Sequence, residues 1–410
     1  MNNAAIVSIG NELLSGQTVD TNSAYLTGRL MSIGVPTVCG YCVGDDLNLI
    51  VEALEHACRH ADLVLVTGGL GPTEDDLTRD ALARFTHCEL VFSEELLAEI
   101  QRFFEIRGAK MAHTNRRQAY IPRGGSALPN PMGTAPGIRI AKGDSLIVSM
   151  PGVPGEMKNM FENCVLPDLK GEGPVVVAKK LKCFGAGESS VADKLGDLMR
   201  RDRNPLVNCT VHGSVITLHI IATARDKDEA DQMIAADNRH LRELLGNLVF
   251  GEQDDTLPAV VGQKLSTAGK TIAVAESCTG GLIGKLLTDV PGASAYFTHG
   301  WLTYSNLAKS AQLGVDRQLI QQYGAVSEQV SKAMAAGARE KARSDISVAV
   351  TGIAGPGGGS SEKPVGLVYI TVETPRESIT RKRIFHGSRA DIRLRTALTA
   401  LDMVRLLPAD

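Results

Sequence analysis

Several hydroxyl side chains and one lysine fall at the glycine-rich ends of expected strands in the last third of the chain. Ser277 stands in AESCTGG, Ser294 in GASAYF, and Tyr304 precedes Lys309 in TYSNLAK; Thr351 opens a second glycine-rich turn, TGIAGP. A lysine held neutral in an apolar pocket can take the proton of a serine, so these residues could hydrolyse a bond without a histidine. Taken singly, each serine or threonine is more simply explained as a helix cap or turn residue. The G-x-S-x-G motif is missing, so a hydrolase triad of that type is not supported.

Glycine-rich turns also follow two expected strands near the start of the chain, at Gly10 and at residues 68–71. A strand, a glycine-rich turn and a helix start together aim backbone N–H groups and the positive helix end at an anion. Asp75 and Asp76 come directly after the second turn. Carboxylates beside a phosphate site predict a divalent cation that bridges a pyrophosphate, with Glu12 and Asp20 as further candidates. The alternative is that Asp75 and Asp76 only cap the following helix. No Walker lysine follows the turn, so an ordinary ATPase is not indicated.

These motifs need strands and helices to hold them, and the chain alternates short β-branched runs with helical stretches. Such alternation is typical of α/β units on a parallel sheet. The pattern predicts strands at 4–9, 36–43, 62–67 and 145–150, and helices at 20–33, 46–60, 75–86 and 93–107. From 171 the order becomes strand, helix (189–202), two strands and a polar helix (226–245), which predicts a small α+β domain. The α/β pattern returns with strands at 270–276, 345–352 and 366–374 and helices at 280–288, 327–342 and 390–406.

The predicted fold class is therefore α/β, with two three-layer α/β domains that flank a small α+β domain. The predicted domains are residues 1–170, 171–254 and 255–410. The run GPGGGSSEKP at 355–364 is interpreted as an internal loop rather than a linker, because a strand follows it at once.

Composition narrows the class of protein. The chain has 410 residues, 43 Lys and Arg against 46 Asp and Glu, and a net charge of −3, which argues against a protein that wraps nucleic acid. The longest apolar runs are of strand length, and the start of the chain lacks the pattern of a secretory signal. We therefore expect a cytoplasmic enzyme whose eight scattered cysteines are buried thiols. Glycine is enriched at 42 residues, while aromatic residues make up only 4%, which suggests sites built largely from backbone.

The first 170 residues resemble a known family. The motifs GNELLSGQTVDTNSAYL, VGDD, TGGLGPTEDDLTRDA, NRRQA, NPMGTAPG and MPGVPGEM occur in the order of the amino-terminal domain of the CinA family, which is similar to the molybdopterin-binding MogA/MoeA domain. The resemblance implies either a pterin site or metal-dependent hydrolysis of ADP-ribose to AMP and ribose 5-phosphate. On the second reading, Asp20, Asp75 and Asp76 would hold the metal ion, whose identity is open, and polarise water. The residues that the resemblance places at the substrate are Gly10, Asn22, Asp46, Gly68, Gly69, Gly71, Glu156 and the turn at 152–155.

The last 155 residues carry a second resemblance. AESCTGG, G-x-S-x-Y-F, TYSNLAK and TGIAGPGGGS followed by KPVG resemble the PncC family of nicotinamide-nucleotide amidases, the carboxy-terminal domain of CinA-type proteins. This implies hydrolysis of nicotinamide mononucleotide to nicotinic acid mononucleotide and ammonia, with no cofactor. Ser294 would be the nucleophile, Lys309 its base and Tyr304 a proton relay, while Ser277 and Thr351 would bind substrate or the oxyanion. Which serine attacks is left open. The glycines expected to bring backbone to the phosphate or oxyanion are Gly280, Gly281, Gly352 and Gly355.

The middle segment, with FGAGESSVADKL, resembles the KH-like domain of the same family. Gly185-Ala186-Gly187 is followed by Glu188 instead of completing a GXXG clamp, so a docking role is expected rather than RNA binding. The whole chain is thus expected to be a bifunctional hydrolase that recycles pyridine nucleotides, without nucleic-acid or membrane partners and as a homodimer. The alternatives are a pterin or molybdenum-cofactor-binding protein and a non-enzymatic regulator related to competence or DNA damage.

Overall fold

The computed structural model of the chain describes residues 1–169, 171 and 173–408. These residues form two compact units, one of Met1–Val177 with Ala222–Met233 and the other of Ala178–Ile221 with Ile234–Asp410. The units are described separately. The predicted domain boundary at Lys170 lies outside the described residues, and the three predicted domain ranges stay a prediction.

The first unit contains a six-stranded mixed sheet in the order β2-β1-β3-β8-β7-β6. Strands β1 (Ala4–Ile9), β2 (Thr37–Val43), β3 (Leu63–Thr67) and β8 (Ser145–Met150) run parallel and agree with the predicted strands. β7 (Gly137–Lys142) and β6 (Ser126–Leu128) extend the sheet antiparallel, and β4 (Leu90–Phe92) pairs with β5 (Tyr120–Pro122). The helices are α1 (Asn11–Leu14), α2 (Thr21–Met31), α3 (Leu47–His60), α4 (Thr78–Thr86), α5 (Glu94–Ile106) and α6 (Pro154–Met160). The predicted helix at 75–86 starts three residues later, at Thr78, because Asp76 is used in the preceding turn.

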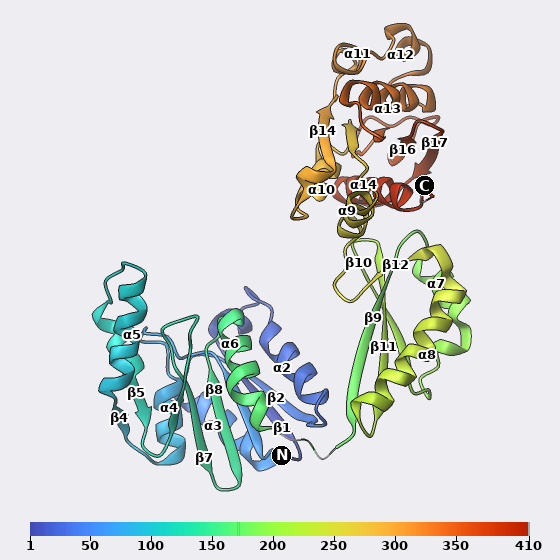
Figure 1. Ribbon diagram of the computed structural model, residues 1–410. Coiled ribbons are helices and arrows are strands. Elements are labelled where there is room, and N and C mark those ends of the chain that lie inside the picture. Colours follow the sequence, from blue (N-terminus) through green and yellow to red (C-terminus); the bar gives the residue numbers. More distant parts are fainter. Residues whose placement is uncertain (170, 172, 409–410) are drawn as a thin grey trace. The chain divides into compact units, whose positions relative to one another are not determined.

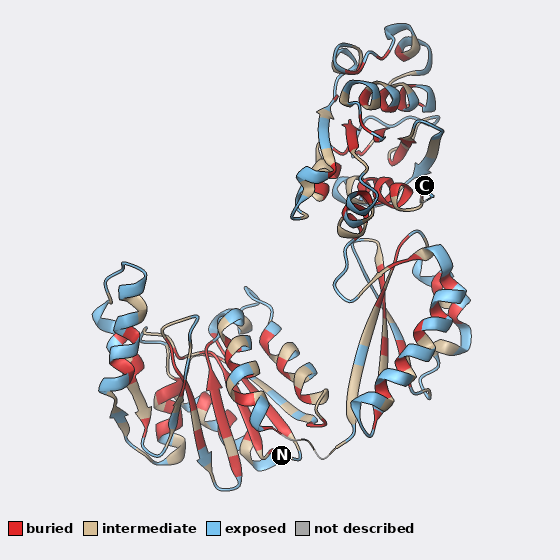
Figure 2. Cartoon of the chain, viewed as in Figure 1, coloured by how far each residue is buried: buried red, intermediate tan, exposed pale blue. Residues whose placement is uncertain are grey.

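Both faces of this sheet are covered, as burial on both sides of β1 requires. Ala5 and Val7 of β1 pack in one core with residues of α3 and α4, such as Leu54. Ile6, one position along, packs in a second core with Leu26 of α2 and residues of α6. Figure 2 shows the buried residues running along the central strands, and Figure 1 shows the helices on either face. This is the predicted three-layer arrangement.

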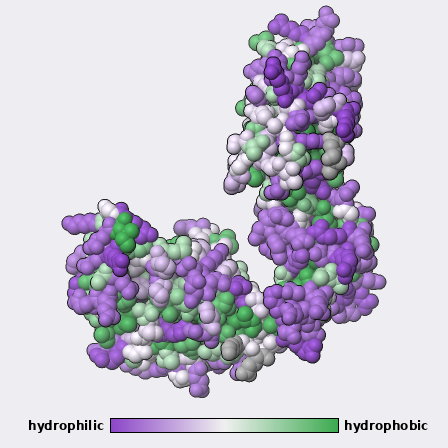
Figure 3. Space-filling model, viewed as in Figure 1, coloured by the Kyte–Doolittle hydropathy of each residue, from purple (hydrophilic) through white to green (hydrophobic). Residues whose placement is uncertain are grey.

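The α+β part has a four-stranded sheet in the order β10-β11-β9-β12. Its strands are β9 (Val175–Cys183), β10 (Leu206–His212), β11 (Val215–Ala224) and β12 (Val249–Glu252), with helices α7 (Glu188–Leu195) and α8 (Lys227–Leu245). Figure 1 shows both helices on one face of the sheet, and the surface over them is mostly hydrophilic in Figure 3. The predicted order of elements is observed with one strand more, β12, and α7 ends at Leu195 rather than at residue 202 because Gly196 interrupts it.

The last α/β domain has a five-stranded sheet in the order β14-β13-β15-β16-β17. β14 (Phe297–Leu302), β13 (Ile272–Glu276) and β15 (Ile346–Gly352) are parallel, while β16 (Leu367–Glu373) and β17 (Ser378–Ile384) are antiparallel to their neighbours. The helices are α9 (Leu257–Thr267), α10 (Leu282–Thr288), α11 (Asn306–Leu313), α12 (Arg317–Tyr323), α13 (Glu328–Ala342) and α14 (Arg389–Arg405).

This sheet is also sandwiched between helices. Val274 belongs to a core formed with α9, α10 and α14, whereas its neighbour Ala275 packs against α11, α12 and α13. The molecule is therefore an α/β protein with two three-layer α/β domains and a small α+β domain between them in sequence. Among the described residues no helix is long and apolar enough to cross a membrane.

Candidate active site and ligand-binding edge

The carboxyl ends of β13, β14 and β15 meet at one edge of the last sheet and carry most of the predicted amidase residues. The Ser277 N–H donates to the Val350 carbonyl over 3.1 Å, which places Ser277 beside the end of β15. The Thr303 N–H donates to the Glu276 carbonyl over 2.9 Å, which brings the end of β14 against the same turn. Ligands of α/β proteins bind at such an edge.

Lys309 lies on α11, the helix that follows β14, and its side chain extends to this edge. Its side chain is 1% exposed, and its Nζ donates to the Ser277 Oγ over 3.1 Å and to the Thr303 carbonyl over 2.7 Å. Burial lowers the pKa of Lys309, because the charged ammonium loses its water and no carboxylate pairs with it among the described residues. A buried lysine inclined to be neutral, hydrogen-bonded to a serine hydroxyl, is the arrangement expected of a nucleophile and its base.

Cys278, next to Ser277, does not compete as nucleophile. Burial raises the pKa of its thiol to about 12, so the thiolate is not formed near neutral pH. Backbone N–H groups and threonine hydroxyls near Ser277 are candidates for binding a ligand. The Thr279 N–H makes no hydrogen bond within the described part of the chain, the Cys278 N–H contacts only its own thiol there, and both lie in the turn that carries Ser277. The hydroxyl oxygens of Thr279 and Thr303 are buried and also lack a partner among those residues.

Ser294 is not brought to Lys309. It lies in a short 3-10 helix, η6 (Ala293–Ala295), just before β14, and its side chain is exposed. In the parallel register Phe297 of β14 is opposite Ile272, the first residue of β13, whereas Ser277 follows the last residue of β13. Ser294 and Ser277 therefore lie toward opposite ends of this strand pair. The expected contact of Ser294 with Lys309 is replaced by one from Ser277, and the chemical role of Ser294 stays a prediction.

Glu276 explains two glycines that were expected to bind phosphate. Its carboxylate is 1% exposed and accepts hydrogen bonds from the N–H groups of Gly281, Ile283 and Gly284, over 3.0, 3.1 and 2.8 Å. The Gly280 N–H donates to the Ser277 carbonyl. Gly280 and Gly281 were expected to let backbone reach the phosphate or the oxyanion; their own N–H groups are engaged by Ser277 and Glu276, and the expectation stays a prediction. Gly281 is needed for its φ of +92°, which other residues rarely adopt.

The second glycine-rich turn is also explained by packing. The Thr351 hydroxyl donates to the Ala325 carbonyl over 2.8 Å. A Cβ on Gly352 would lie 2.7 Å from Val368 Cγ2, and one on Gly355 would lie 2.6 Å from Val365 Cγ1. These three residues lie at the same edge of the sheet as Ser277. Their roles there are in packing: the threonine hydroxyl is bonded within the protein, and the two glycines leave room for valine side chains.

Two arginines at the start of α14 complete the edge, and the sequence reasoning missed both. Arg389 donates to the Gly355 carbonyl over 2.7 Å and to the Tyr304 hydroxyl over 3.1 Å. Arg393 donates to the Thr279 carbonyl through Nε and Nη2, over 3.1 and 2.6 Å. Tyr304 itself is 64% exposed, and its ring does not enter the buried dyad. The signal that could have found the arginines is their spacing of four, which puts both on one face of a helix.

In the first unit the ends of β1, β3 and β8 come together. Asn22 is buried on α2, and its Nδ2 donates to the Thr67 Oγ1 over 2.8 Å and to the Gly152 carbonyl over 2.9 Å, while its Oδ1 has no partner among the described residues. A Cβ on Gly68 would lie 2.2 Å from the Ile9 carbonyl oxygen, so only glycine allows the two loops to approach. This edge lies where the chain crosses from β2 over to β3, on the other side of β1, which is where doubly wound sheets bind ligands.

The other predicted glycines at this edge have local packing roles as well. A Cβ would lie 2.4 Å from a Glu12 carboxylate oxygen at Gly10 and 2.4 Å from Thr78 Oγ1 at Gly69. At Gly71 it would lie 2.5 Å from an oxygen of Asp76. Glu156, on α6, accepts a hydrogen bond from Asn130 over 2.7 Å. These contacts hold the loops in shape but do not exclude a ligand beside them.

The predicted metal ligands do not form a ready cation site. Asp20 caps α2 through the Ser23 N–H and hydroxyl, and Asp46, which was expected at the substrate, caps α3 through two N–H groups. Both oxygens of Asp76 accept hydrogen bonds from the turn before it, from Gly71 and from Thr73. No group of three or more His, Cys, Asp or Glu side chains that could hold a metal ion is found among the described residues. The trio of Asp20, Asp75 and Asp76 thus does not fit a resident metal as it stands, and its carboxylates are used as caps and turn anchors.

Two charged residues at this edge escaped the sequence reasoning. Burial raises the pKa of Asp45, and the nearby charges of Glu12, Asp75 and Asp76 raise it further, so these acids lie close enough to repel one another. Arg79 is 2% exposed and donates to the Leu70 carbonyl over 2.6 Å and to the Gly71 carbonyl. Burial lowers the pKa of Arg79 to about 10. Arg79 thus stabilises the glycine-rich turn at Leu70 and Gly71, a role that the sequence motif alone does not reveal.

Comparison with known proteins finds three family models that match the chain one after another. Residues 5–171 match the probable molybdopterin binding domain, residues 178–251 the damage-inducible protein CinA KH domain, and residues 254–407 the CinA C-terminal domain. A CinA-like protein of Dictyoglomus thermophilum is 42% identical over 98% of this chain and 98% of its own length. The chain belongs to the CinA family. Another CinA-like protein, from Gloeothece citriformis, is 42% identical with the same coverage of both chains.

Among solved structures, the chain is similar to the competence/damage inducible protein CihA of Agrobacterium tumefaciens. It is 42% identical to this chain over 36% of the chain and 94% of its own length, with a TM-score of 0.35. The resemblance seen in the sequence motifs is therefore confirmed at the level of the family, in both α/β domains and in the KH-like segment.

Proposed function

We propose that the last domain of this CinA-family chain is an amidase that deamidates nicotinamide mononucleotide. The observation that carries the proposal is the buried Lys309, which has no acidic partner among the described residues and lies 3.1 Å from the Ser277 hydroxyl. Ser277 is assigned as the nucleophile, in place of the Ser294 expected first, and Lys309 as its base.

The proposed reaction is acyl transfer to serine and then to water. Lys309 takes the Ser277 proton as the hydroxyl oxygen bonds to the carboxamide carbon, and the carbonyl oxygen becomes an oxyanion. The N–H groups of Cys278 and Thr279, to which no other described residue accepts a hydrogen bond, would hold that oxyanion. The C–N bond then breaks as Lys309 returns the proton to the leaving nitrogen, which departs as ammonia. Water attacks the ester, Lys309 takes its proton and passes it to Ser277, and nicotinic acid mononucleotide is released.

Arg389 and Arg393 are proposed to bind the 5′-phosphate of the substrate. Arg393 donates to the Thr279 carbonyl in the Ser277 turn, and Arg389 donates to the Gly355 carbonyl in the turn that follows β15. A guanidinium fixed in this way keeps further N–H groups for a phosphate. In this proposal the two arginines bind the phosphate, in place of the glycine backbone that was expected to do so.

The experiment is ammonia release from nicotinamide mononucleotide by the purified chain. Ser277→Ala and Lys309→Met are each expected to lower kcat at least ~10²-fold, the usual scale for loss of a general base or nucleophile. Methionine keeps the volume of the buried lysine stem, and the melting temperature of each variant shows whether it is folded. Ser294→Ala is the matched serine variant and is expected to stay within about threefold of wild type, since its hydroxyl does not contact Lys309 in this structure. If Ser294→Ala is inactive and Ser277→Ala active, the nucleophile is misassigned; no ammonia from folded wild type removes the amidase.

For the first domain we propose hydrolysis of ADP-ribose to AMP and ribose 5-phosphate. The observation that favours it is the convergence of the loops after β1, β3 and β8 around the buried Asn22, whose Oδ1 lacks a partner among the described residues. Dependence on a divalent metal ion stays part of the proposal, although the carboxylates are engaged elsewhere. AMP formation that survives EDTA would remove the metal from it.

The alternatives at this edge are a pterin ligand and a regulatory role without turnover. A molybdopterin precursor that binds the chain while ADP-ribose is not turned over would favour the first. Absence of both turnover reactions in the folded chain would favour the second.

A further inference from the structure

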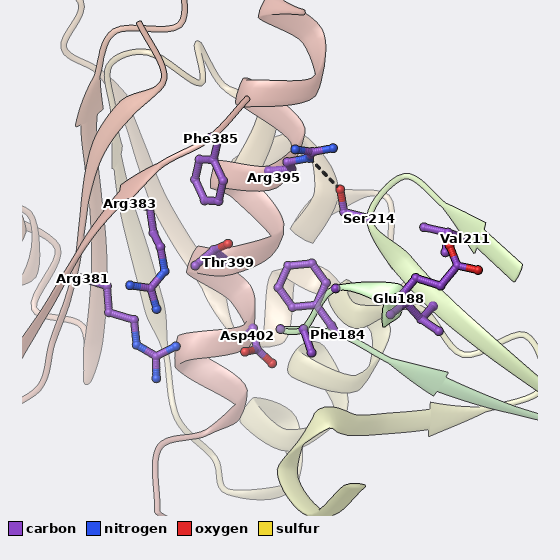
Figure 4. A pocket seen from close by; sticks show the side chains of 14 residues that line it. Phe184, Glu188, Val211, Ser214, Arg381, Arg383, Phe385, Arg395, Thr399 and Asp402 are labelled. Atoms are coloured by element: carbon purple, nitrogen blue, oxygen red, sulfur yellow. Dashed lines mark hydrogen bonds between the residues drawn. The ribbon is translucent and has the colours of Figure 1, made fainter. Parts of the chain in front are cut away.

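A cavity of about 400 Å³ lies away from both sites described above, where the KH-like part meets the last domain within the second unit. It is lined by the loop before α7, by the β10–β11 hairpin, by β17 and by α14 (Figure 4). The two parts are bound together here, since Arg395 of α14 donates to the Ser214 Oγ over 2.9 Å and Phe184 belongs to the core of the last domain. The cavity is therefore a feature of one compact unit, and its volume is that of a small-molecule site.

Three arginines face this cavity, and two of them, Arg381 and Arg383, leave most of their N–H groups without a hydrogen bond among the described residues. Figure 4 shows Arg381 and Arg383 side by side on β17, both turned toward α14. Arg381 makes no hydrogen bond or ion pair among the described residues, and Arg383 donates only to the carbonyl of its neighbour Lys382. Arg395, at the other side, uses Nε and Nη1 on Ser214 and His386. Unpaired guanidinium groups that converge on a cavity are typical of an anion site.

The two acids of the lining do not cancel this positive charge. Asp402 is 4% exposed and forms an ion pair with Arg405 over 2.7 Å, and the charge of Arg381 also acts on it, so this one carboxylate is shared between two arginines. Glu188 accepts a hydrogen bond from the Cys209 thiol, and Figure 4 shows it beside Val211, on the side of the cavity away from β17. The excess positive charge of the cavity therefore lies on Arg381 and Arg383.

The rest of the lining suits a ring attached to the anion. Phe385 and Phe184 both line the cavity, and Figure 4 shows their rings near the arginines. Gly187, which precedes the first residue of α7, also lines it, and no side chain caps that helix end. An aromatic face for a base, guanidinium groups for phosphates and an open helix start together describe a nucleotide site.

We propose that this cavity binds a nucleotide, with the phosphates on Arg381 and Arg383 and the base against Phe385. The site is separate from the amidase edge, whose arginines lie at the start of α14, and from the loops of the first unit. It thus adds a third ligand site to those of the proposed function and does not depend on either activity.

The test is calorimetric titration of the full chain with ADP in the absence of metal, with wild type, Arg381→Gln/Arg383→Gln and Lys382→Gln compared. The double variant is expected to weaken ADP binding at this site at least ~10-fold, the scale for two lost charge-assisted hydrogen bonds. Lys382 is the matched control: it carries the same charge on the same strand but alternates to the other face, opposite Tyr369. Its variant is expected to bind ADP as wild type does.

The region of contact is checked by hydrogen exchange. ADP is expected to protect residues 184–188 in the wild type and in Ser277→Ala, and not in the double arginine variant. Equal ADP affinity and protection in the double variant would overturn the proposal. So would inorganic phosphate that binds as tightly as ADP, since that indicates a bare anion site, or single-stranded RNA that displaces ADP at lower concentration, since that indicates a nucleic-acid surface.

Discussion

Lys309 is the residue whose surroundings differ most from those of an ordinary lysine. Its stem is packed in the protein, its Nζ has only a serine hydroxyl and backbone carbonyls as hydrogen-bond partners, and a charged ammonium there costs free energy that water does not repay. Burial therefore lowers the pKa of Lys309 and leaves more of it neutral at a given pH. A lysine can serve as a base only in that neutral form.

A pH profile follows from this shift. We expect kcat/KM for ammonia release to rise with pH as Lys309 loses its proton, with a midpoint below the ordinary lysine pKa of 10.5. Only the neutral amine can accept the Ser277 proton, so activity is lost as pH falls through the pKa of the free enzyme. The measurement is kcat/KM from pH 5 upward in buffers of equal ionic strength. A profile that is flat below pH 10, or that first rises at the ordinary lysine value, would contradict the role of Lys309 as base.

The choice between two serines shows what sequence can and cannot predict for a single residue. The motifs predicted that Lys309, Tyr304 and the serines belong to one domain, and left open which serine attacks. The answer depends on strand register, because Ser277 follows β13 whereas Ser294 precedes β14, and parallel pairing sends these two positions to opposite ends. Nothing in the spacing of the serines reveals which end Lys309 reaches.

At the scale of the element, Glu276 joins β13 to α10. It is the last residue of β13, and its buried carboxylate accepts three N–H groups at the start of the helix, as an internal counterpart of a bound anion. The turn between these elements carries Ser277, so the carboxylate also holds the proposed nucleophile in place. A strand-end glutamate in an apolar run gives no sequence signal for this role, since helix caps are sought among the residues just before the helix.

Replacing Glu276 tests whether its hydrogen bonds to the start of α10 stabilise the protein. Glu276→Gln is expected to lower the free energy of unfolding by about 2–3 kcal/mol, because charged hydrogen bonds are lost and the amide NH₂ faces N–H donors. Glu328→Gln is the control: this glutamate lies in the first turn of α13, is exposed and pairs with Lys332 alone among the described residues, so its loss is expected to cost under about 0.5 kcal/mol. Urea unfolding of both variants measures the difference. Equal small effects would mean that the Glu276 carboxylate does not stabilise α10.

The strand β12, which the sequence did not predict, is held to the α+β sheet by a charged cluster. It has only four residues and follows a long polar helix, so its pattern is too short to be recognised. Its Glu252 contacts Lys179, Arg242 and Asn238. Burial raises the pKa of Glu252, but hydrogen bonds from these three residues outweigh that effect, and the net pKa falls to about 2.

This shift predicts a dependence of stability on acid. Glu252 has a lower pKa in the folded chain than its ordinary 4.5, so its contribution to stability is complete above 4.5 and is lost as pH falls toward 2. Glu252→Gln is expected to be less stable than wild type at pH 7 by about 1–2 kcal/mol, with the gap closing between pH 4.5 and 2. Urea unfolding at a series of pH values measures the gap; a gap that does not change with pH would contradict the assignment.

At the scale of the whole molecule, the chain joins two sites that are built in the same way and from different residues. Each lies at the carboxyl edge of its own parallel strands, in loops whose glycines allow close approach of backbone, as at Gly68, or a positive φ, as at Gly281. Sequence periodicity predicted β1, β3 and β8 of one edge and β13 and β15 of the other, because alternation and glycine turns are local signals, but it did not predict β14. Arg79 and Asp45 in one site and Arg389 and Arg393 in the other were not predicted, since only tertiary packing brings them to their loops.

Because each site draws its residues from one unit, the two activities are expected to be separable by mutation. Lys309→Met is expected to lose ammonia release at least ~10²-fold and to keep AMP formation from ADP-ribose within about twofold. Asp76→Asn, which removes the carboxylate that holds Gly71 and Thr73, is expected to lower AMP formation at least ~10-fold and to leave ammonia release unchanged. Both reactions are measured on the same preparations, with thermal unfolding as the check that each variant is folded. If either folded variant loses both activities together, the sites share a residue or a conformational step, and their independence is wrong.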